Sequence, residues 1–126
     1  MSDPSTFASR HFLWHVNQAR RANGKPYLRR DLQLDVEARV RTNRILTDFR
    51  HDIAWVTAHN HFAVSGEILG WTSAHDSADQ WLIDAFMASP EHKAVILGDW
   101  DRFGDAVVSV PDGKTYVTVL FGKGKR

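Results

Sequence analysis

The sequence of 126 residues contains no cysteine, which excludes disulfide bonds and thiolate chemistry. It has no apolar run approaching the roughly 18 residues that a membrane-spanning helix needs, so we expect no membrane span. Lys and Arg number 16 against 15 Asp and Glu, and this balance does not favour nucleic acid as a partner. The first residues lack the basic and apolar regions of a signal peptide, which leaves a cytoplasmic location open.

The composition is that of a soluble globular protein, with 43% hydrophobic and 25% charged residues. We expect a single domain over residues 1–126, with frayed ends at 1–5 and 123–126, because the sequence has no linker, repeat or low-complexity segment. Five Trp and seven Phe supply a core. We expect the Trp residues to lie mainly in that core, whereas exposure of Trp55 or Trp71 would favour a ligand groove.

Apolar residues at helical spacing predict two helices in the first half of the chain. Phe12, Val16 and Ala19 predict a helix over about 5–23, which ends at the Asn-Gly pair 23–24. Asp31 is a plausible N-cap for a second helix towards Phe49. The helical period fades from 51 to 70, which indicates a loop leading into a short strand.

The second half predicts two more helices and a hairpin. Ser77 and Gln80 have the spacing of a capping box, and Ser89-Pro90 places a cap and an N1 proline at the start of a short helix. The β-rich runs 106–110 and 116–121 are joined by a Pro-Asp-Gly-Lys turn. The predicted order is α-α-β-α-α-β-β.

Five segments in this order resemble the CAP superfamily, the SCP-like domain of cysteine-rich secretory, antigen 5 and pathogenesis-related proteins, in a short bacterial-like form without cysteines. Residues 13–28 are similar to an opening "L..VN..R...G..PL", and 31–38 match the start of the family's second helix. Residues 66–70 resemble "GENxxxG", and 86–97 resemble "WMxSPxHxxxIL". Residues 99–104 with the closing hairpin match the last part.

The resemblance implies an α+β fold, a three-layer α-β-α sandwich around a central antiparallel sheet. It also implies a cleft with two His and two acidic residues, for which the counterparts are His51, Glu67 and His92. The fourth has no clear match, and Asp84 is a possible substitute. Ile68 replaces the Asn of the "GEN" segment, which removes a polar side chain from the predicted cleft.

His92 falls at N3 of the short helix, where the helix dipole disfavours the imidazolium and keeps the ring neutral. Neutral His51 and His92 with a carboxylate are a tentative set for zinc. The competing interpretation is a structural hydrogen bond between His92 and Glu67. His59 or His61 are alternatives for the role of His51. They are two apart, so on a strand both would point to one face and could chelate a metal.

Ser89 is not expected to act as a nucleophile, since no Gly-x-Ser-x-Gly elbow surrounds it and an N-cap hydroxyl bonds backbone N–H groups. Two functions remain, with the first favoured. One is a non-enzymatic module that binds a small hydrophobic ligand, a lipid or a peptide, secreted or at the cell surface by family resemblance. The other is a metal-assisted, peptidase-like hydrolase with Glu67 as base and His51 and His92 as ligands.

Overall fold

The computed structural model describes residues 5–7, 9–73 and 78–125. Within them, the helices are α1 (Arg10–Ala22), α2 (Leu32–Ile45), α3 (Ile53–His59), α4 (Ala78–Ala88) and α5 (Pro90–Ile96). The strands are β1 (Ser5–Phe7), β2 (Arg29–Arg30), β3 (Phe62–Thr72), β4 (Arg102–Ser109) and β5 (Thr115–Lys125). This mixture of helices and strands confirms the predicted α+β class.

The described strands form one sheet in the order β1-β4-β5-β3, with β2 beside β4. The β1–β4, β4–β5 and β5–β3 pairs are antiparallel, whereas the two-residue β2 lies parallel to β4. The sheet is therefore antiparallel apart from this short pair. The strand β3 is at one edge, and its pairing of Glu67 with Leu120 sets which way each β3 side chain points.

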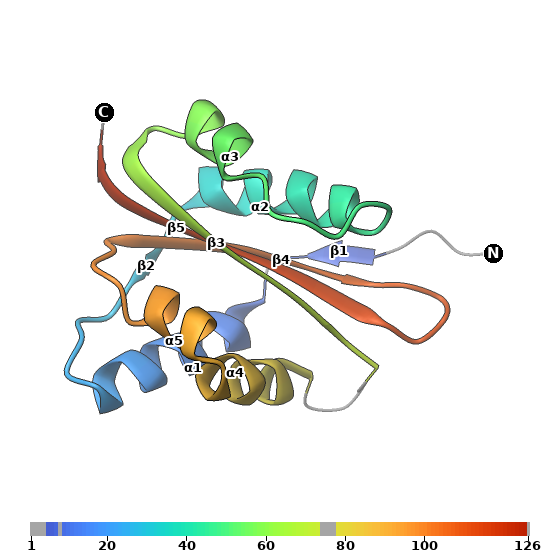
Figure 1. Ribbon diagram of the computed structural model, residues 1–126, viewed down its shortest axis with the longest axis horizontal. Coiled ribbons are helices and arrows are strands. Elements are labelled where there is room, and N and C mark those ends of the chain that lie inside the picture. Colours follow the sequence, from blue (N-terminus) through green and yellow to red (C-terminus); the bar gives the residue numbers. More distant parts are fainter. Residues whose placement is uncertain (1–4, 8, 74–77, 126) are drawn as a thin grey trace.

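Helices lie on both sides of this sheet (Figure 1). On the side of α1, α4 and α5, thirteen buried apolar residues form the larger cluster. On the side of α2 and α3 the cluster is smaller and consists of Leu34, Ala38, Val56, Phe62, Ala106 and Leu120. Burial of an aliphatic or aromatic side chain contributes about 1.5–3 kcal/mol, so the first side supplies most of the hydrophobic stabilisation.

The first two helices are shorter than predicted, and their caps explain why. The hydroxyl of Ser9 accepts the N–H of Phe12, so α1 begins at Arg10 and Ser5–Phe7 is free to pair with β4. Asp31 caps α2 as predicted. That helix ends at Ile45 rather than near Phe49, because Thr47 bonds back to a carbonyl of the last turn.

The segment 51–70 differs most from the prediction of a loop and a short strand. It contains α3, capped by Asp52, and most of the eleven-residue β3. The helix was missed because Val56 is its one buried residue, which is too little for a visible period. The strand β5 also extends through Lys123 to Lys125, where a frayed end was expected.

The later predictions hold for the described residues. Ser89 and Pro90 begin α5, and the turn between β4 and β5 places Gly113 at φ 94°, a conformation that suits glycine. The Ser77 of the predicted capping box lies outside the described residues.

Candidate functional site around Glu67

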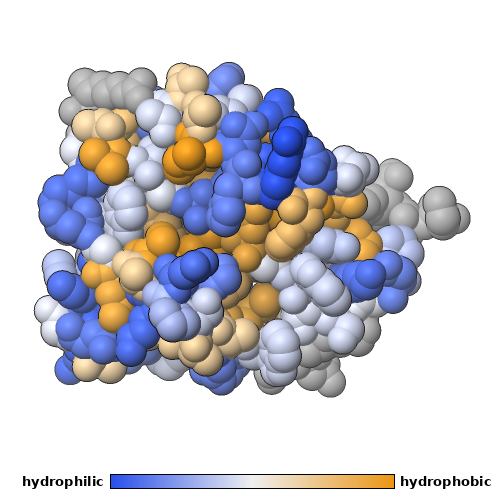
Figure 2. Space-filling model, viewed as in Figure 1, coloured by the Kyte–Doolittle hydropathy of each residue, from blue (hydrophilic) through white to orange (hydrophobic). Residues whose placement is uncertain are grey.

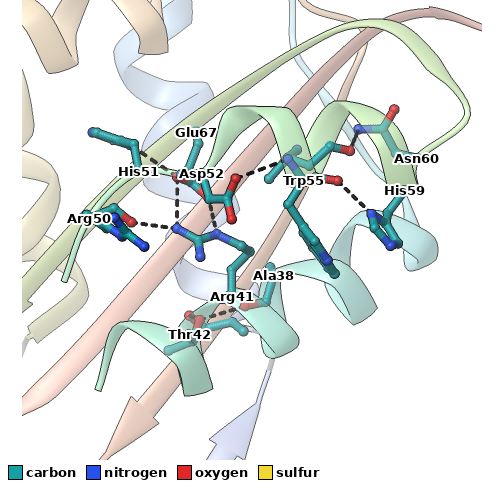
Figure 3. Close-up of polar contacts among 12 residues, drawn as sticks. Ala38, Arg41, Thr42, Arg50, His51, Asp52, Trp55, His59, Asn60 and Glu67 are labelled. Carbon is teal, nitrogen blue, oxygen red and sulfur yellow. Dashed lines mark hydrogen bonds and ion pairs between the residues drawn. The ribbon is translucent and has the colours of Figure 1, made fainter. Parts of the chain in front are cut away.

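Glu67 lies in the middle of β3 with its side chain only 1% exposed, on the side of the sheet that α2 covers. The Nε of Arg41 donates to Oε2 of Glu67 at 2.7 Å, and Nη2 donates to Oε1 at 3.2 Å. Figure 3 shows the Arg41 guanidinium reaching Glu67 from α2. Each buried charge is thus neutralised by the other in a two-point contact.

Two further groups approach the same carboxylate. The backbone N–H of Asp52 donates to Oε1 at 3.1 Å, and Nδ1 of His51 lies 3.1 Å from that oxygen. Arg41 also donates from Nη2 to the carbonyl of Arg50 at 2.7 Å. Glu67 and Arg41 therefore connect β3, α2 and the loop before α3.

Arg41 was missed as a site residue in the sequence. It occupies the buried stripe of α2 together with Leu34, Ala38 and Ile45, at i, i+4, i+7 and i+11. A charged residue on an apolar stripe must find a partner when it is buried. That position was the signal that indicated a buried ion pair, although it did not identify Glu67 as the partner.

The two imidazoles predicted from the sequence belong to different elements. His51 lies in the loop before α3, and His92 lies in α5. His51 is 61% exposed, whereas His92 on α5 is partly buried with its ring 5.0 Å from that of Phe86. Burial lowers the pKa of His92, and the nearby charge of His51 lowers it further. His92 is therefore held towards its neutral form, and the two rings are close enough to influence each other.

His92 does not bond Glu67 in the described contacts. Its Nδ1 lies 2.9 Å from Oγ of Ser89, and Ser89 makes no side-chain cap bond to α5. The expectation that the Ser89 hydroxyl bonds backbone N–H groups is wrong, because the hydroxyl contacts the ring of His92 in place of the backbone. His51 is thus the one predicted imidazole that contacts Glu67.

The other candidates have separate partners. Asp84 is exposed on α4 and accepts a hydrogen bond from Gln80 at 2.7 Å. Nδ1 of His59 lies 2.8 Å from the carbonyl of Trp55, and Nε2 of His61 lies 3.3 Å from Asp31. None of these three has a described bond to Glu67.

Glu37, on α2, is another buried carboxyl besides Glu67 of β3, and it was not predicted from the sequence. Both of its oxygens are buried and have no hydrogen-bond partner among the described residues. Burial raises its pKa to about 7, against an ordinary 4.5, with an opposing contribution from His59 and a reinforcing one from Asp31. Glu37 therefore differs from Glu67, which has a cation beside it.

The residues described here do not fit a zinc site. Nowhere in 5–7, 9–73 and 78–125 do three or more His, Cys, Asp or Glu side chains come together in a group that could hold a metal ion. Both oxygens of Glu67 are engaged by Arg41, and Nδ1 of His92 by Ser89. The tentative zinc set of His51 and His92 gains no support from this geometry.

Three of the five Trp residues are exposed, so the expectation of a mainly internal set is wrong. Trp14 and Trp81 are exposed on α1 and α4. Trp71 on β3 is 48% exposed, with its ring 6.4 Å from that of Tyr116. Phe49, also exposed, lies 6.5 Å from the same Tyr116 ring. We call Phe49, Trp71 and Tyr116 the aromatic row.

The fold and the site define an α+β domain with a buried, salt-bridged glutamate on an edge strand of its sheet. The family model described as "CAP: Cysteine-rich secretory protein family" matches residues 13–121. The chain belongs to this CAP family, as the resemblance of its segments predicted.

Two solved structures share the fold. An outer surface protein from Borrelia burgdorferi is 18% identical with a TM-score of 0.79, and the match covers 98% of this chain and all of that one. A cysteine-rich secretory protein from Staphylococcus aureus is also 18% identical, with a TM-score of 0.68 over 89% of this chain and 37% of that chain. No curated protein matches the sequence. In the part of the chain that is described, no helix has the length and apolarity to cross a membrane.

Proposed function

We propose that this CAP domain is a non-enzymatic binding module for a small hydrophobic ligand, a lipid or a peptide. The observation that carries the proposal is the engagement of Glu67 by Arg41, Asp52 and His51. A general base must be free to approach the proton it takes, either directly or through one water. A buried carboxylate held by a guanidinium on both oxygens is a structural anchor, and the ligand would bind at exposed side chains on the same side of the sheet.

The aromatic row supports a hydrophobic ligand on the side of the sheet that carries Glu67. Trp71 follows Glu67 by four residues on β3, and Phe49 precedes His51 by two. Exposed aromatic rings offer a large apolar area, and Trp and Tyr add a polar N–H or O–H group. Small-molecule sites are commonly lined by such side chains. Figure 2 shows hydrophobic residues exposed between the two helical layers on one face of the molecule.

The proposal also includes the cellular location and the layered architecture of the domain. One solved relative is an outer surface protein, which supports a secreted or cell-surface location for this chain as well. The helices on both sides of the sheet support the three-layer α-β-α sandwich of the family (Figure 1). A surface location would suit a module that binds and does not catalyse.

Thermal shift and tryptophan fluorescence with fatty acids, a sterol and mixed peptides test the proposal. We expect saturable binding of at least one hydrophobic probe, weakened about tenfold or more by Trp71→Ala, a loss of roughly 1.4 kcal/mol. Trp14→Ala and Trp81→Ala remove exposed rings from other elements and are the matched controls. No response to any probe, or equal losses in the controls, would contradict a hydrophobic site at the aromatic row.

The alternative is the metal-assisted hydrolase with Glu67 as base and His51 and His92 as ligands. It requires stoichiometric zinc after purification and loss of that zinc in His92→Ala. Elemental analysis with a peptide-mixture turnover assay decides between the two functions. We expect less than a stoichiometric amount of metal and no turnover. Stoichiometric zinc and peptide turnover in the wild type, with loss of the zinc and of the turnover in His92→Ala, would establish the hydrolase.

A further inference from the structure

A second candidate site lies at the opposite end of the sheet from the aromatic row. A pocket of about 340 Å³ opens where β2 meets the start of β4, and Phe62 at the start of β3 also lines it. Trp71 is nine residues further along β3, roughly 30 Å at the rise of a strand. This pocket is therefore separate from the site of the proposed function.

Two arginines face each other at this pocket without an acidic partner. The parallel register pairs Arg29 of β2 with Arg102 of β4, and both line the pocket. The one described side-chain bond of Arg102 is a long one, 3.4 Å, to the carbonyl of Asp101. No described residue forms an ion pair with either guanidinium, so two like charges lie side by side uncompensated.

One acidic residue, Asp101, also lines the pocket, but it and the neighbouring Asp99 lie beside another cation, Lys123. Asp101 accepts the N–H of Gly124 at 3.0 Å and lies 3.9 Å from Nζ of Lys123. Asp99 pairs with the same Lys123 at 2.9 Å. Together with Arg29 and Arg102, the group carries three cations and two anions. An anion in the pocket would meet two free guanidinium groups.

Two aromatic side chains, Tyr27 and Trp100, form flat walls of the pocket beside its charged residues. Tyr27 is half-exposed beside Arg29, and Trp100 forms another wall. The Trp100 indole is held in place, because its Nε1 donates to the carbonyl of Val95 at 2.7 Å and its ring stacks 5.7 Å from Phe121. Gly66 also presses on it so closely that a Cβ there would lie 2.8 Å from the ring. A fixed aromatic wall needs no reorganisation to receive a planar ligand.

We propose that this pocket binds a small aromatic carboxylate, with the carboxylate between Arg29 and Arg102 and the ring against Tyr27 and Trp100. A guanidinium can donate two parallel N–H groups to the two oxygens of a carboxylate. Because the group is planar and rigid, little conformational entropy is lost when these bonds form. The volume is within the range of small-molecule sites. Neither guanidinium takes part in the proposed function.

Isothermal titration of the full chain with indole-3-acetate tests the proposal. We expect saturable binding that falls at least tenfold in Arg29→Gln and in Arg102→Gln, and with indole-3-acetamide in place of the acid. Arg39→Gln on α2, exposed and remote from the pocket, is the matched control and should bind as the wild type does. Both tested arginines reach solvent, and circular dichroism verifies that the variants fold.

The amide probe acts on the unchanged protein and keeps the test decisive if a variant fails to fold. Equal binding of the acid and the amide would overturn the proposal, since it would show that the charge is not recognised. Inorganic phosphate is the other probe, and phosphate that binds as tightly as indole-3-acetate would overturn the aromatic specificity. Absence of binding by indole-3-acetate would overturn the site itself.

Discussion

The two sides of the sheet differ in the size of their apolar clusters and in the partners of their buried charged residues. The side of α1, α4 and α5 buries a continuous apolar cluster that includes four phenylalanines. It also buries Arg20 of α1, which is 1% exposed and whose guanidinium donates to the carbonyls of Pro26, Ile96 and Gly98. The side of α2 and α3 buries six apolar residues and, among them, the charged pair Arg41–Glu67 and the unpartnered Glu37. A hydrophobic contact survives a change in pH or salt, whereas a buried charge depends on its partner. On the α2 side a buried carboxylate depends on one guanidinium, so a single change there should have a large and specific effect.

Removing the cation on that side has the largest expected effect. Arg41→Ala leaves the buried Glu67 without its cationic partner, and breaking such a pair costs about 3–5 kcal/mol. Urea unfolding followed by circular dichroism measures the loss. Arg39→Ala, an exposed arginine on the same helix, should change stability by less than about 0.5 kcal/mol. Equal losses at the two positions would contradict a special role for the buried pair.

Glycine contacts sharpen the comparison between the two sides. A Cβ on Gly104 would overlap the backbone of Leu34 in α2, whereas a Cβ on Gly70 would meet the far end of the Phe86 ring in α4. A ring can shift but a helix backbone cannot, so we expect Gly104→Ala to cost about 1–3 kcal/mol and Gly70→Ala to cost less. The same unfolding assay checks this order, and the reverse order would show that α2 is the more adjustable layer.

Glu37 gives the α2 side a pH dependence. Its folded pKa of about 7 lies above the ordinary 4.5, so the unfolded chain releases this proton first as the pH rises. Stability should fall from about pH 4.5 to about pH 7 and then level off. Burial also raises the pKa of Asp105 to about 7, so Glu37→Gln removes only the part of the fall that Glu37 contributes. Its advantage over the wild type should reach on the order of 1–3 kcal/mol above pH 7.

Unfolding measured at pH 4.5 and pH 8 tests the role of Glu37. Glu91→Gln on α5 is the matched control, because Glu91 is exposed and its substitution should change stability by less than about 0.5 kcal/mol. If the gain in unfolding free energy from Glu37→Gln is the same at both pH values, ionisation of the Glu37 carboxyl does not destabilise the folded protein.

The smallest expected effect concerns His92, on the side of α1, α4 and α5. Ser89→Ala removes the hydroxyl beside Nδ1 of His92, at a cost of about 0.5–1.5 kcal/mol for one hydrogen bond. The lowered pKa of His92 means that stability from its neutral form is lost as the pH falls through 6.5. Histidine NMR titration in Ser89→Ala checks whether the pKa of His92 moves, and an unchanged titration would show that the hydroxyl does not influence the ring.

The sequence predicted the features that local chemistry controls. The cap Asp31, the start of α5 at Ser89-Pro90, the Gly113 turn and the family segments were readable because each depends on neighbours in the chain. Glu67 was named from the family segment. Its partner Arg41 was not, because 26 residues separate them and only the packing of α2 on the sheet brings them together.

The site beyond Glu67 shows the same limit. Ser89 was assigned to backbone N–H groups, yet the ring of His92 lies near enough to compete for its hydroxyl. Likewise, α3 has a clear N-cap in Asp52 but too few buried residues to show a helical period. Exposure of Trp71 depends on which side of β3 it faces and on what covers that side. Such features are set by tertiary packing, which a single sequence does not display.

The central claim is that Glu67 serves as the structural partner of Arg41. A double-mutant cycle of urea unfolding with Arg41→Met, Glu67→Met and the pair of substitutions together tests it most directly. Each single variant should lose about 3–5 kcal/mol, and the double variant should recover most of that loss because no unpaired charge remains. Losses that simply add in the double variant would contradict the claim and would return Glu67 to the list of candidate catalytic groups.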